Sequence, residues 1–554
     1  MADSEAIEAE TQEYTKWLVA RIRSFHSDPL HSAAYLGNLA QFLQRPRHNS
    51  ARNARSPASR DHKTNRATKE GNPPFIYEYA IPNTGTEPQL TKFNEIATYK
   101  ETISDKAHNL NFNEIVFLAG RPSAEWLCAI GVRYKLDHRF FHQHLNFLPT
   151  GKRDWFTAPT LPSRSRNVLR LCIPSILFIG EHRYVNLDGL KKSRSDCDRQ
   201  LRQRFRRFQE DTSTVPGQSI VRRMNIHSGD NYVIEQELSA CLHKRGDKWT
   251  VLVWTDSGEE KDFDFIPGAN TLKAAVDRLD FCPIFFEKDL SEKPATPPLA
   301  GTGSQTARVN QPLSSLPGNY GYTIDWRRAA TDPLSTLQEL FTFHAASEVQ
   351  YLNMLEQFIT EQITHAESMS GEPEIGSILH FDYAKSILVR HDAHIQSILC
   401  FLQSDLQDWG KAAPQTQSPD GDLLSTLQTD LGYLSTRIHN IIELCEAGRS
   451  TIMSNTSIEE NKRSNEQAAL VADLTKATTR LTFIFLPISF VTSVFGMNFR
   501  QFGQGALSIW LWVAITLPLL VFCIVLVERG GYIKKLLGKV LNSLGENFDR
   551  FVCW

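Results

Sequence analysis

The sequence lacks the motifs of common catalytic and nucleotide-binding sites. It has no Gly-rich phosphate loop, no nucleophile elbow and no paired metal-ligand motif. Its nine cysteines are scattered from Cys128 to Cys553 without a CxxC pair, so their spacing indicates neither a disulfide framework nor a zinc site. Such cysteines are typical of a reducing compartment. We therefore expect neither an enzyme nor a prosthetic group.

A strong charge imbalance and a targeting signal are also missing. The net charge is −2 with 22% charged residues, so bulk charge indicates no nucleic-acid partner. The N-terminus, Met1–Glu5, is acidic, and it has neither the apolar core of a secretory signal nor the Arg-rich character of a mitochondrial presequence. We expect the bulk of the chain to lie in the cytosol.

Several polar clusters lack the partners that a binding site needs. Residues 191–207 carry eight basic side chains but no aromatic array for stacking bases, which favours a solvated helix face over a nucleic-acid site. The histidines at 138–144 lack cysteine or acidic residues at metal-binding spacing, and a second group lies on a predicted helix. The histidines that we interpret as residues of helix surfaces are His138, His142, His144, His391 and His394.

Charged residues are absent from two stretches near the C-terminus. Leu481–Phe495 has none, and Leu507–Val527 is apolar over about 20 residues, enough to cross a hydrocarbon core of about 30 Å. The first stretch reaches that length only if Thr482 and the threonines before it belong to the same helix. Together the two stretches predict a membrane hairpin with a short connecting loop.

The basic residues predict the orientation of this hairpin. Its loop holds only Arg500. Because lysine and arginine are retained on the cytoplasmic side, both termini should face the cytosol and the loop should face outward, with the plasma membrane as the expected location. The basic residues outside the hairpin are Lys476, Arg480, Arg529, Lys534, Lys535 and Lys539.

Small and hydroxyl side chains follow one face of the first predicted span. They recur at steps of three, four and seven residues, which places them on one side of a helix, and Leu486 fills the gap. Such hydroxyls bond to a neighbouring helix or to the preceding turn of their own helix, or they line water. The residues of this hydroxyl stripe are Thr475, Thr478, Thr482, Ser489, Ser493 and Gly496.

Two motifs in this region carry a family resemblance. Phe485–Phe490 reads Phe-Leu-Pro-Ile-Ser-Phe, and Phe495–Phe499 contains the triplet Gly-Met-Asn. Together with the second apolar stretch and a long helical region in front, they resemble the signature of the CorA family of divalent-cation channels. The resemblance implies a homo-oligomer, with five subunits, in membrane lipid. It also implies that Mg²⁺ is the transported ion and that divalent ions regulate the gate.

The resemblance assigns a metal path to the first span. Mg²⁺ gives up its inner water reluctantly, so amide oxygens that bind the hydrated ion suit its entry. These oxygens would come from the Gly-Met-Asn triplet at the outer mouth, with hydroxyl rings deeper in the pore and an apolar constriction at Leu486 that closes by dewetting. The candidate metal-contacting residues are Asn498, Gly496, Met497, Ser493 and Ser489.

One feature departs from the family pattern. Loops of the family carry acidic residues after the triplet, whereas residues 499–505 have none and include Arg500. A ring of positive charge repels cations, although salt screens it over about 8–10 Å. Two alternatives therefore stay open, a transporter of zinc, nickel or cobalt, and a non-conducting membrane-anchored interaction protein. The capping of a helix end is the alternative role of Asn498.

The rest of the chain is predicted to be cytosolic and of mixed structure. Four short apolar runs predict strands, at 115–118, 169–173, 176–179 and 249–254, and Pro122–Leu127 predicts a helix start. Leucines and isoleucines from Leu424 to Cys445 alternate steps of three and four, as in a coiled coil.

The predicted fold class is a membrane protein with an α/β cytosolic domain, a helical coiled-coil stalk and a two-helix C-terminal transmembrane hairpin. The first segment should be helical, with Trp17, Leu18, Ile22 and Phe25 on one apolar face. The expected segments are an N-terminal helical segment (1–44), a disordered basic linker (45–74), the α/β domain (75–289), a linker or long loop (290–330), the stalk (331–480), the hairpin (481–527) and an amphipathic tail (528–554) that lies on the inner membrane surface or packs on the stalk.

Overall fold

The computed structural model divides the chain into two compact units. Unit 1 comprises Met1–Ser370 and Glu374–Ser450, and unit 2 comprises Gly371–Pro373 and Thr451–Trp554. The structure describes residues 13–17, 19–20, 39, 42–43, 75–106, 112–146, 161, 167–179, 187–210, 217–258, 279–284, 311–368, 375–404, 409, 420–496, 508–525 and 529.

Unit 1 is built on a mixed sheet of eight strands in the part of the chain that the structure describes. The strand order is β2-β1-β3-β7-β6-β4-β8, and β5 pairs with β6. The pair β3–β7 is parallel and the other pairs are antiparallel. The strands are β1 (Ile76–Ile81), β2 (Gln89–Phe93), β3 (Asn113–Ala119), β4 (Val168–Ile179), β5 (Arg223–Ile226), β6 (Asn231–Arg245), β7 (Lys248–Thr255) and β8 (Leu279–Phe281).

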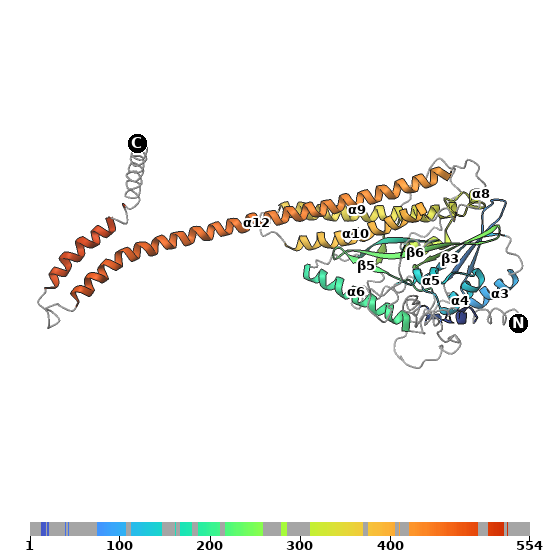
Figure 1. Cartoon of the computed structure of the whole chain (residues 1–554), viewed down its shortest axis with the longest axis horizontal. Coiled ribbons are helices and arrows are strands. Elements are labelled where there is room, and N and C mark those ends of the chain that lie inside the picture. The colour runs from blue at the N-terminus through green and yellow to red at the C-terminus, as the bar shows by residue number, and fades with distance from the viewer. Residues whose placement is uncertain are drawn as a thin grey trace, which may run out of the picture. The chain divides into compact units, whose positions relative to one another are not determined.

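Helices cover both faces of this sheet (Figure 1). Helices α9 and α10 pack on β4, while α5 and α6 pack on β6 and β5. The α-helices of unit 1 are α3 (Ile96–Lys106), α4 (Ala124–Tyr134), α5 (His138–His144), α6 (Leu187–Glu210), α7 (Pro312–Ser315), α8 (Trp326–Ala329), α9 (Gln338–Ser368) and α10 (Ile375–Ser404), and α12 (Asp420–Phe495) begins in unit 1.

The local sequence explains where α4 and α5 begin. Ser123 precedes α4, and its side chain accepts a hydrogen bond from the backbone N–H of Trp126 at 3.3 Å. Asp137 caps α5 in the same way through the N–H of Arg139, at 2.9 Å. Both side chains satisfy backbone donors that the first helical turn leaves unpaired. The helix start predicted at 122–127 is therefore confirmed.

The predicted strands are present, and two of them are one. The runs at 169–173 and 176–179 belong to the single strand β4. Pro174 lies within β4 and stands opposite Glu235 of β6. Proline has no N–H to donate, and within the described residues β8 pairs with Leu177–Ile179 and not with Pro174, so no ladder bond on that side is lost. The prediction of two separate strands at 169–173 and 176–179 was therefore wrong.

Part of the expected linker at 290–330 is ordered. Residues 312–315 form α7, the 3₁₀-helix η5 follows at Leu316–Gly318, and α8 lies at Trp326–Ala329. Leu313 and Tyr320 are buried. Residues 311–330 differ from a linker because apolar side chains such as Leu316 and Ile324 are also buried and anchor the segment, which proline- and glycine-rich composition does not reveal.

The N-terminal segment buries residues that the predicted apolar face did not include. Val19 and Phe42 lie in the main core, whereas Trp17 is 48% exposed. The other three residues of the predicted apolar face lie outside the described residues, as do the predicted linker at 45–74 and all of the C-terminal tail except Arg529.

The coiled-coil pattern corresponds to a buried seam on α12. Leu431, Leu434 and Ile438 are each at most 2% exposed. Contacts with the same chain surround this seam, because Arg437 bonds Glu356 of α9 at 2.7 Å and Ser435 bonds Asp392 of α10 at 2.7 Å. The seam therefore joins α12 to α9 and α10 of its own chain, with a 3₁₀-turn, η6 (Ser335–Leu337), leading into α9.

Candidate functional site

The C-terminal part of α12 is suited to a membrane. Within the described residues, Leu423–Phe495 is the one helix long and apolar enough to span a bilayer. A second apolar helix, Ile509–Val525, is shorter than that requirement. The structure thus supports the first predicted span, and the two-helix hairpin stays a prediction.

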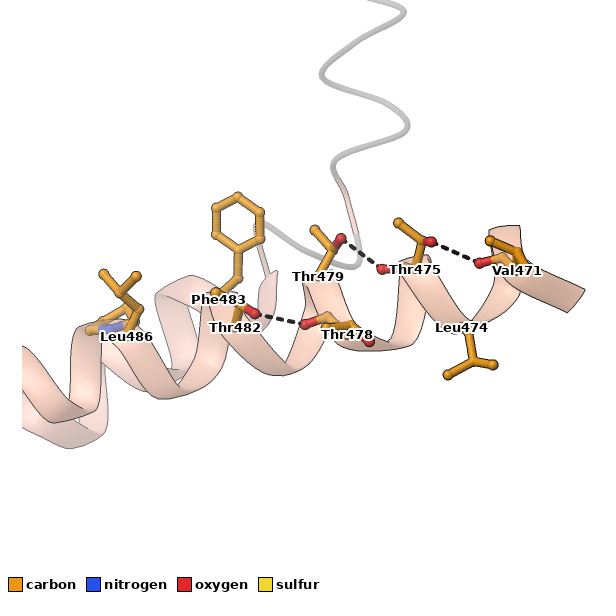
Figure 2. Close-up of a pocket in the computed structure, with 9 residues that line it drawn as sticks. Val471, Leu474, Thr475, Thr478, Thr479, Thr482, Phe483 and Leu486 are labelled. Carbon is orange, nitrogen blue, oxygen red and sulfur yellow. Dashed lines mark hydrogen bonds between the residues drawn. The ribbon is translucent and has the colours of Figure 1, made fainter. Parts of the chain in front are cut away.

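The hydroxyl stripe is exposed on α12, and its hydroxyls at Thr475, Thr482 and Ser489 donate hydrogen bonds to the preceding turn. Thr475 Oγ1 donates to Val471 O at 2.7 Å, and Thr482 Oγ1 donates to Thr478 O at 2.9 Å. Figure 2 shows these bonds. Ser489 Oγ donates to a carbonyl in the same way. A hydroxyl that donates its hydrogen keeps acceptor lone pairs, so the stripe offers oxygen atoms along the helix surface.

The other faces of this segment are apolar and also exposed within unit 2. Phe485 is 62% exposed, Leu486 64% and Phe490 68%. Leu486 also lines a hollow together with Thr478 and Thr482 of the stripe (Figure 2). A helix that exposes large apolar side chains on several faces needs lipid or further protein around it.

The outer end of the predicted path is tightly turned at Gly496. Its N–H donates to Thr492 O at 2.7 Å, and a Cβ added at this glycine would lie 2.7 Å from the same oxygen. A larger side chain would therefore displace the end of the helix. Ser493 is exposed one turn earlier. Met497, Asn498 and Arg500 lie outside the described residues.

A buried ionic cluster lies between the sheet and α9–α10, and it was not predicted. It consists of Glu235 of β6, Glu348 of α9, and Arg390 and His391 of α10. His391 lies between the two carboxylates, with Nε2 3.2 Å from Glu235 and Nδ1 2.9 Å from Glu348. Arg390 donates to Glu235 at 2.5 Å. Because His391 is only 1% exposed, its interpretation as a residue of a helix surface is wrong.

The partners in this cluster set its protonation. Burial alone lowers the pKa of His391, but Glu348 and Glu235 outweigh it and raise the pKa to about 10. Burial raises the pKa of Glu235, yet hydrogen bonds and charge from His391 and Arg390 hold it well below its usual range. Opposite charges make this burial possible.

A second buried histidine also corrects an interpretation of the sequence. His144 has no exposed surface, and it stacks on Trp254 with 4.1 Å between ring centroids. Its Nδ1 lies 2.9 Å from Ser239 Oγ, and its Nε2 lies 3.1 Å from Asp256. These partners are about 100 residues away in the sequence, so no local spacing could have revealed them.

Comparison with known proteins finds a family whose model matches the region that contains the candidate pore. The family model of the CorA-like Mg²⁺ transporter protein matches residues 331–529. This match confirms the resemblance indicated by the two motifs. The family consists of transporter proteins, in agreement with the expectation that the chain is not an enzyme. No curated protein matches the sequence.

Solved structures also match over most of the chain. The complete structure of the CorA magnesium transporter from Methanocaldococcus jannaschii is 11% identical, with a TM-score of 0.33, and the match covers 82% of this chain and 98% of that one. The structure of the full-length CmaX protein is 14% identical, with a TM-score of 0.28, and the match covers 83% of this chain and 99% of that one.

Proposed function

We propose that this chain, whose residues 331–529 carry a CorA-like Mg²⁺ transporter region, forms a homo-oligomeric channel for divalent cations, with Mg²⁺ as the transported ion. The observation that carries the proposal is the hydroxyl stripe. It lies on the membrane-suited part of α12, inside the matched region, and it ends at Gly496, the first residue of the Gly-Met-Asn triplet.

The chemistry of the stripe suits a hydrated dication. Mg²⁺ prefers oxygen ligands and keeps most of its water, so neutral oxygens can hold its hydration shell without stripping it. Asn498 would supply amide oxygens at the mouth, and Gly496 its backbone carbonyl. Ser493 and Ser489 would supply hydroxyl oxygens below them. Selectivity would then depend on the ring size and on the orientation of these dipoles.

One chain cannot enclose such a path. Two membrane helices cannot surround water, so a stripe that lines a path in a single hairpin would face lipid, which is costly for exposed polar groups. Identical subunits that turn their stripes inward would remove this cost, and the CorA resemblance implies five of them. In that arrangement Leu486 forms the apolar constriction, both termini face the cytosol, and the pore lies in the plasma membrane.

Metal uptake by liposomes tests this proposal. Liposomes that contain the full chain should take up Mg²⁺. Asn498→Ala removes the amide oxygens at the mouth and should reduce the uptake rate at least about tenfold, which corresponds to a loss of about 1.4 kcal/mol of stabilisation. Gln504→Ala is the matched control, since it removes an amide from the loop but not from the triplet, and uptake should stay unchanged.

Other results would replace the proposal. Uptake of zinc, nickel or cobalt without Mg²⁺ would indicate a transporter of another metal. No uptake by the wild-type protein would favour a non-conducting interaction protein, which Arg500 and the acid-free loop would then explain. Uptake that persists in Asn498→Ala would show that Asn498 is not needed to bind the ion at the mouth.

A further inference from the structure

We propose that Cys172 of β4, Glu235 of β6 and His391 of α10 form a zinc-binding site that joins the sheet to α10. Among the described residues, these three place a sulfur, a carboxylate oxygen and an imidazole nitrogen within 4.8 Å of one another. All three residues are at most 4% exposed. The proposal does not depend on the channel, because every ligand lies in unit 1.

The spacing of the donor atoms fits a small tetrahedral ion. In a zinc site with bonds of about 2.0–2.2 Å, a nitrogen and an oxygen ligand lie about 3.3 Å apart. His391 Nε2 and Glu235 Oε1 are 3.2 Å apart. With Cys172 as the third ligand, one tetrahedral position is left for a water molecule.

The surroundings of His391 resemble those of a metal-bound histidine. A ligating imidazole generally donates its other N–H to a carboxylate, which orients the ring. Glu348 takes that place, because its carboxylate lies 2.9 Å from His391 Nδ1. His344 contacts the backbone of Cys172, because its Nδ1 lies 2.8 Å from the Cys172 carbonyl oxygen. Residues of α9 thus contact two of the three ligands, and Arg390 of α10 contacts the third, Glu235.

The charges around the site balance those of a dication. A Cys172 thiolate, Glu235 and Glu348 supply three negative charges, and Zn²⁺ with Arg390 supplies three positive charges. A buried ion is tolerated only with such compensation. Zinc binds the thiolate and the neutral imidazole, so its binding releases the protons that these groups carry to the solvent.

The donor set separates this ion from the transported one. Thiolate and imidazole suit zinc, whereas Mg²⁺ takes oxygen ligands. Cysteine, glutamate and histidine also come from three different elements of unit 1. A bound ion would therefore hold β4, β6 and α10 together.

Metal analysis of the purified full chain tests the site. After loading with zinc chloride and desalting, we expect about one zinc ion per chain, as a dedicated site retains its metal. Cys172→Ser should lose it. Cys241→Ser is the matched control, because Cys241 is a buried thiol in the same sheet, and its partner Val168 lies four residues, about 13 Å, along β4 from Cys172. This control should keep the zinc.

Two further measurements separate the site from folding defects and from the pore. Cobalt-loaded wild-type protein should show a thiolate-to-cobalt charge-transfer band, which requires no variant to fold. Asn498→Ala should retain its zinc. Absence of the band, retention of zinc by Cys172→Ser, or loss of zinc in Asn498→Ala would each overturn the proposal.

Discussion

At the scale of single residues, the buried His227 is expected to make unit 1 sensitive to acid. His227 is buried with Nε2 3.0 Å from the Tyr351 hydroxyl. Burial is the main cause that lowers its pKa, to about 3, with further lowering from Arg194 and His380 against an opposing effect of Glu235. His227 is therefore neutral in the folded chain at physiological pH, while an unfolded chain protonates it below about pH 6.5.

This difference predicts a loss of stability as the pH falls. Because the folded pKa lies below the unfolded one, stability is fully present above about pH 6.5 and declines towards pH 3, by up to about 1.4 kcal/mol per pH unit from this group. In thermal unfolding of the detergent-solubilised chain at pH 7 and pH 5, His227→Gln should show a smaller shift of the midpoint than the wild type.

His439→Gln serves as the control for that comparison. The side chain of His439 is 59% exposed, so its removal should leave the pH dependence unchanged. Equal midpoint shifts in His227→Gln and the wild type would show that His227 does not contribute to the acid sensitivity.

At the scale of elements, the heptad pattern of α12 correctly predicted a buried seam but not its partners. Alternating steps of three and four specify which side of a helix is apolar. They do not specify whether the facing helix comes from another chain or from the same one. The hydrogen bonds of Ser435 and Arg437 with α10 and α9 show that this seam faces its own chain.

Truncation of a seam residue should therefore destabilise unit 1 itself. Ile438 has no exposed surface, and Ile438→Ala should cost about 2–5 kcal/mol through lost burial and a residual cavity. Tyr433→Ala on the same helix is the control. Tyr433 is 61% exposed, and its replacement should stay within about 0.5 kcal/mol.

Unfolding midpoints of the two variants decide between the two kinds of packing. Only the Ile438 variant should melt at a lower temperature, and its midpoint should depend on protein concentration no more than that of the wild type, because the seam lies within one chain. A midpoint that depends more strongly on protein concentration in Ile438→Ala than in the wild type would indicate that the seam packs between subunits instead.

At the scale of the whole molecule, the exposed segment of α12 leads us to expect that several chains assemble in a membrane. Its hydroxyl stripe needs an aqueous or protein environment, and its phenylalanines need an apolar one. We expect light scattering of the detergent-solubilised complex to give a mass of several chains, five according to the CorA resemblance. The same sample in SDS should give the mass of one chain. A single chain in mild detergent would contradict the channel.

The sequence by itself determined the membrane-suited part of α12, its hydroxyl stripe, the short strands and the seam. These features follow from composition and from repeats of two, three and four residues, which can be recognised within a short stretch of the sequence. The tertiary structure decided where His144 and His391 lie, because their partners Asp256, Glu348 and Glu235 are distant in sequence. Burial of a histidine depends on charges that only folding brings together, so neither the ionic cluster nor the proposed zinc site leaves a local pattern in the sequence.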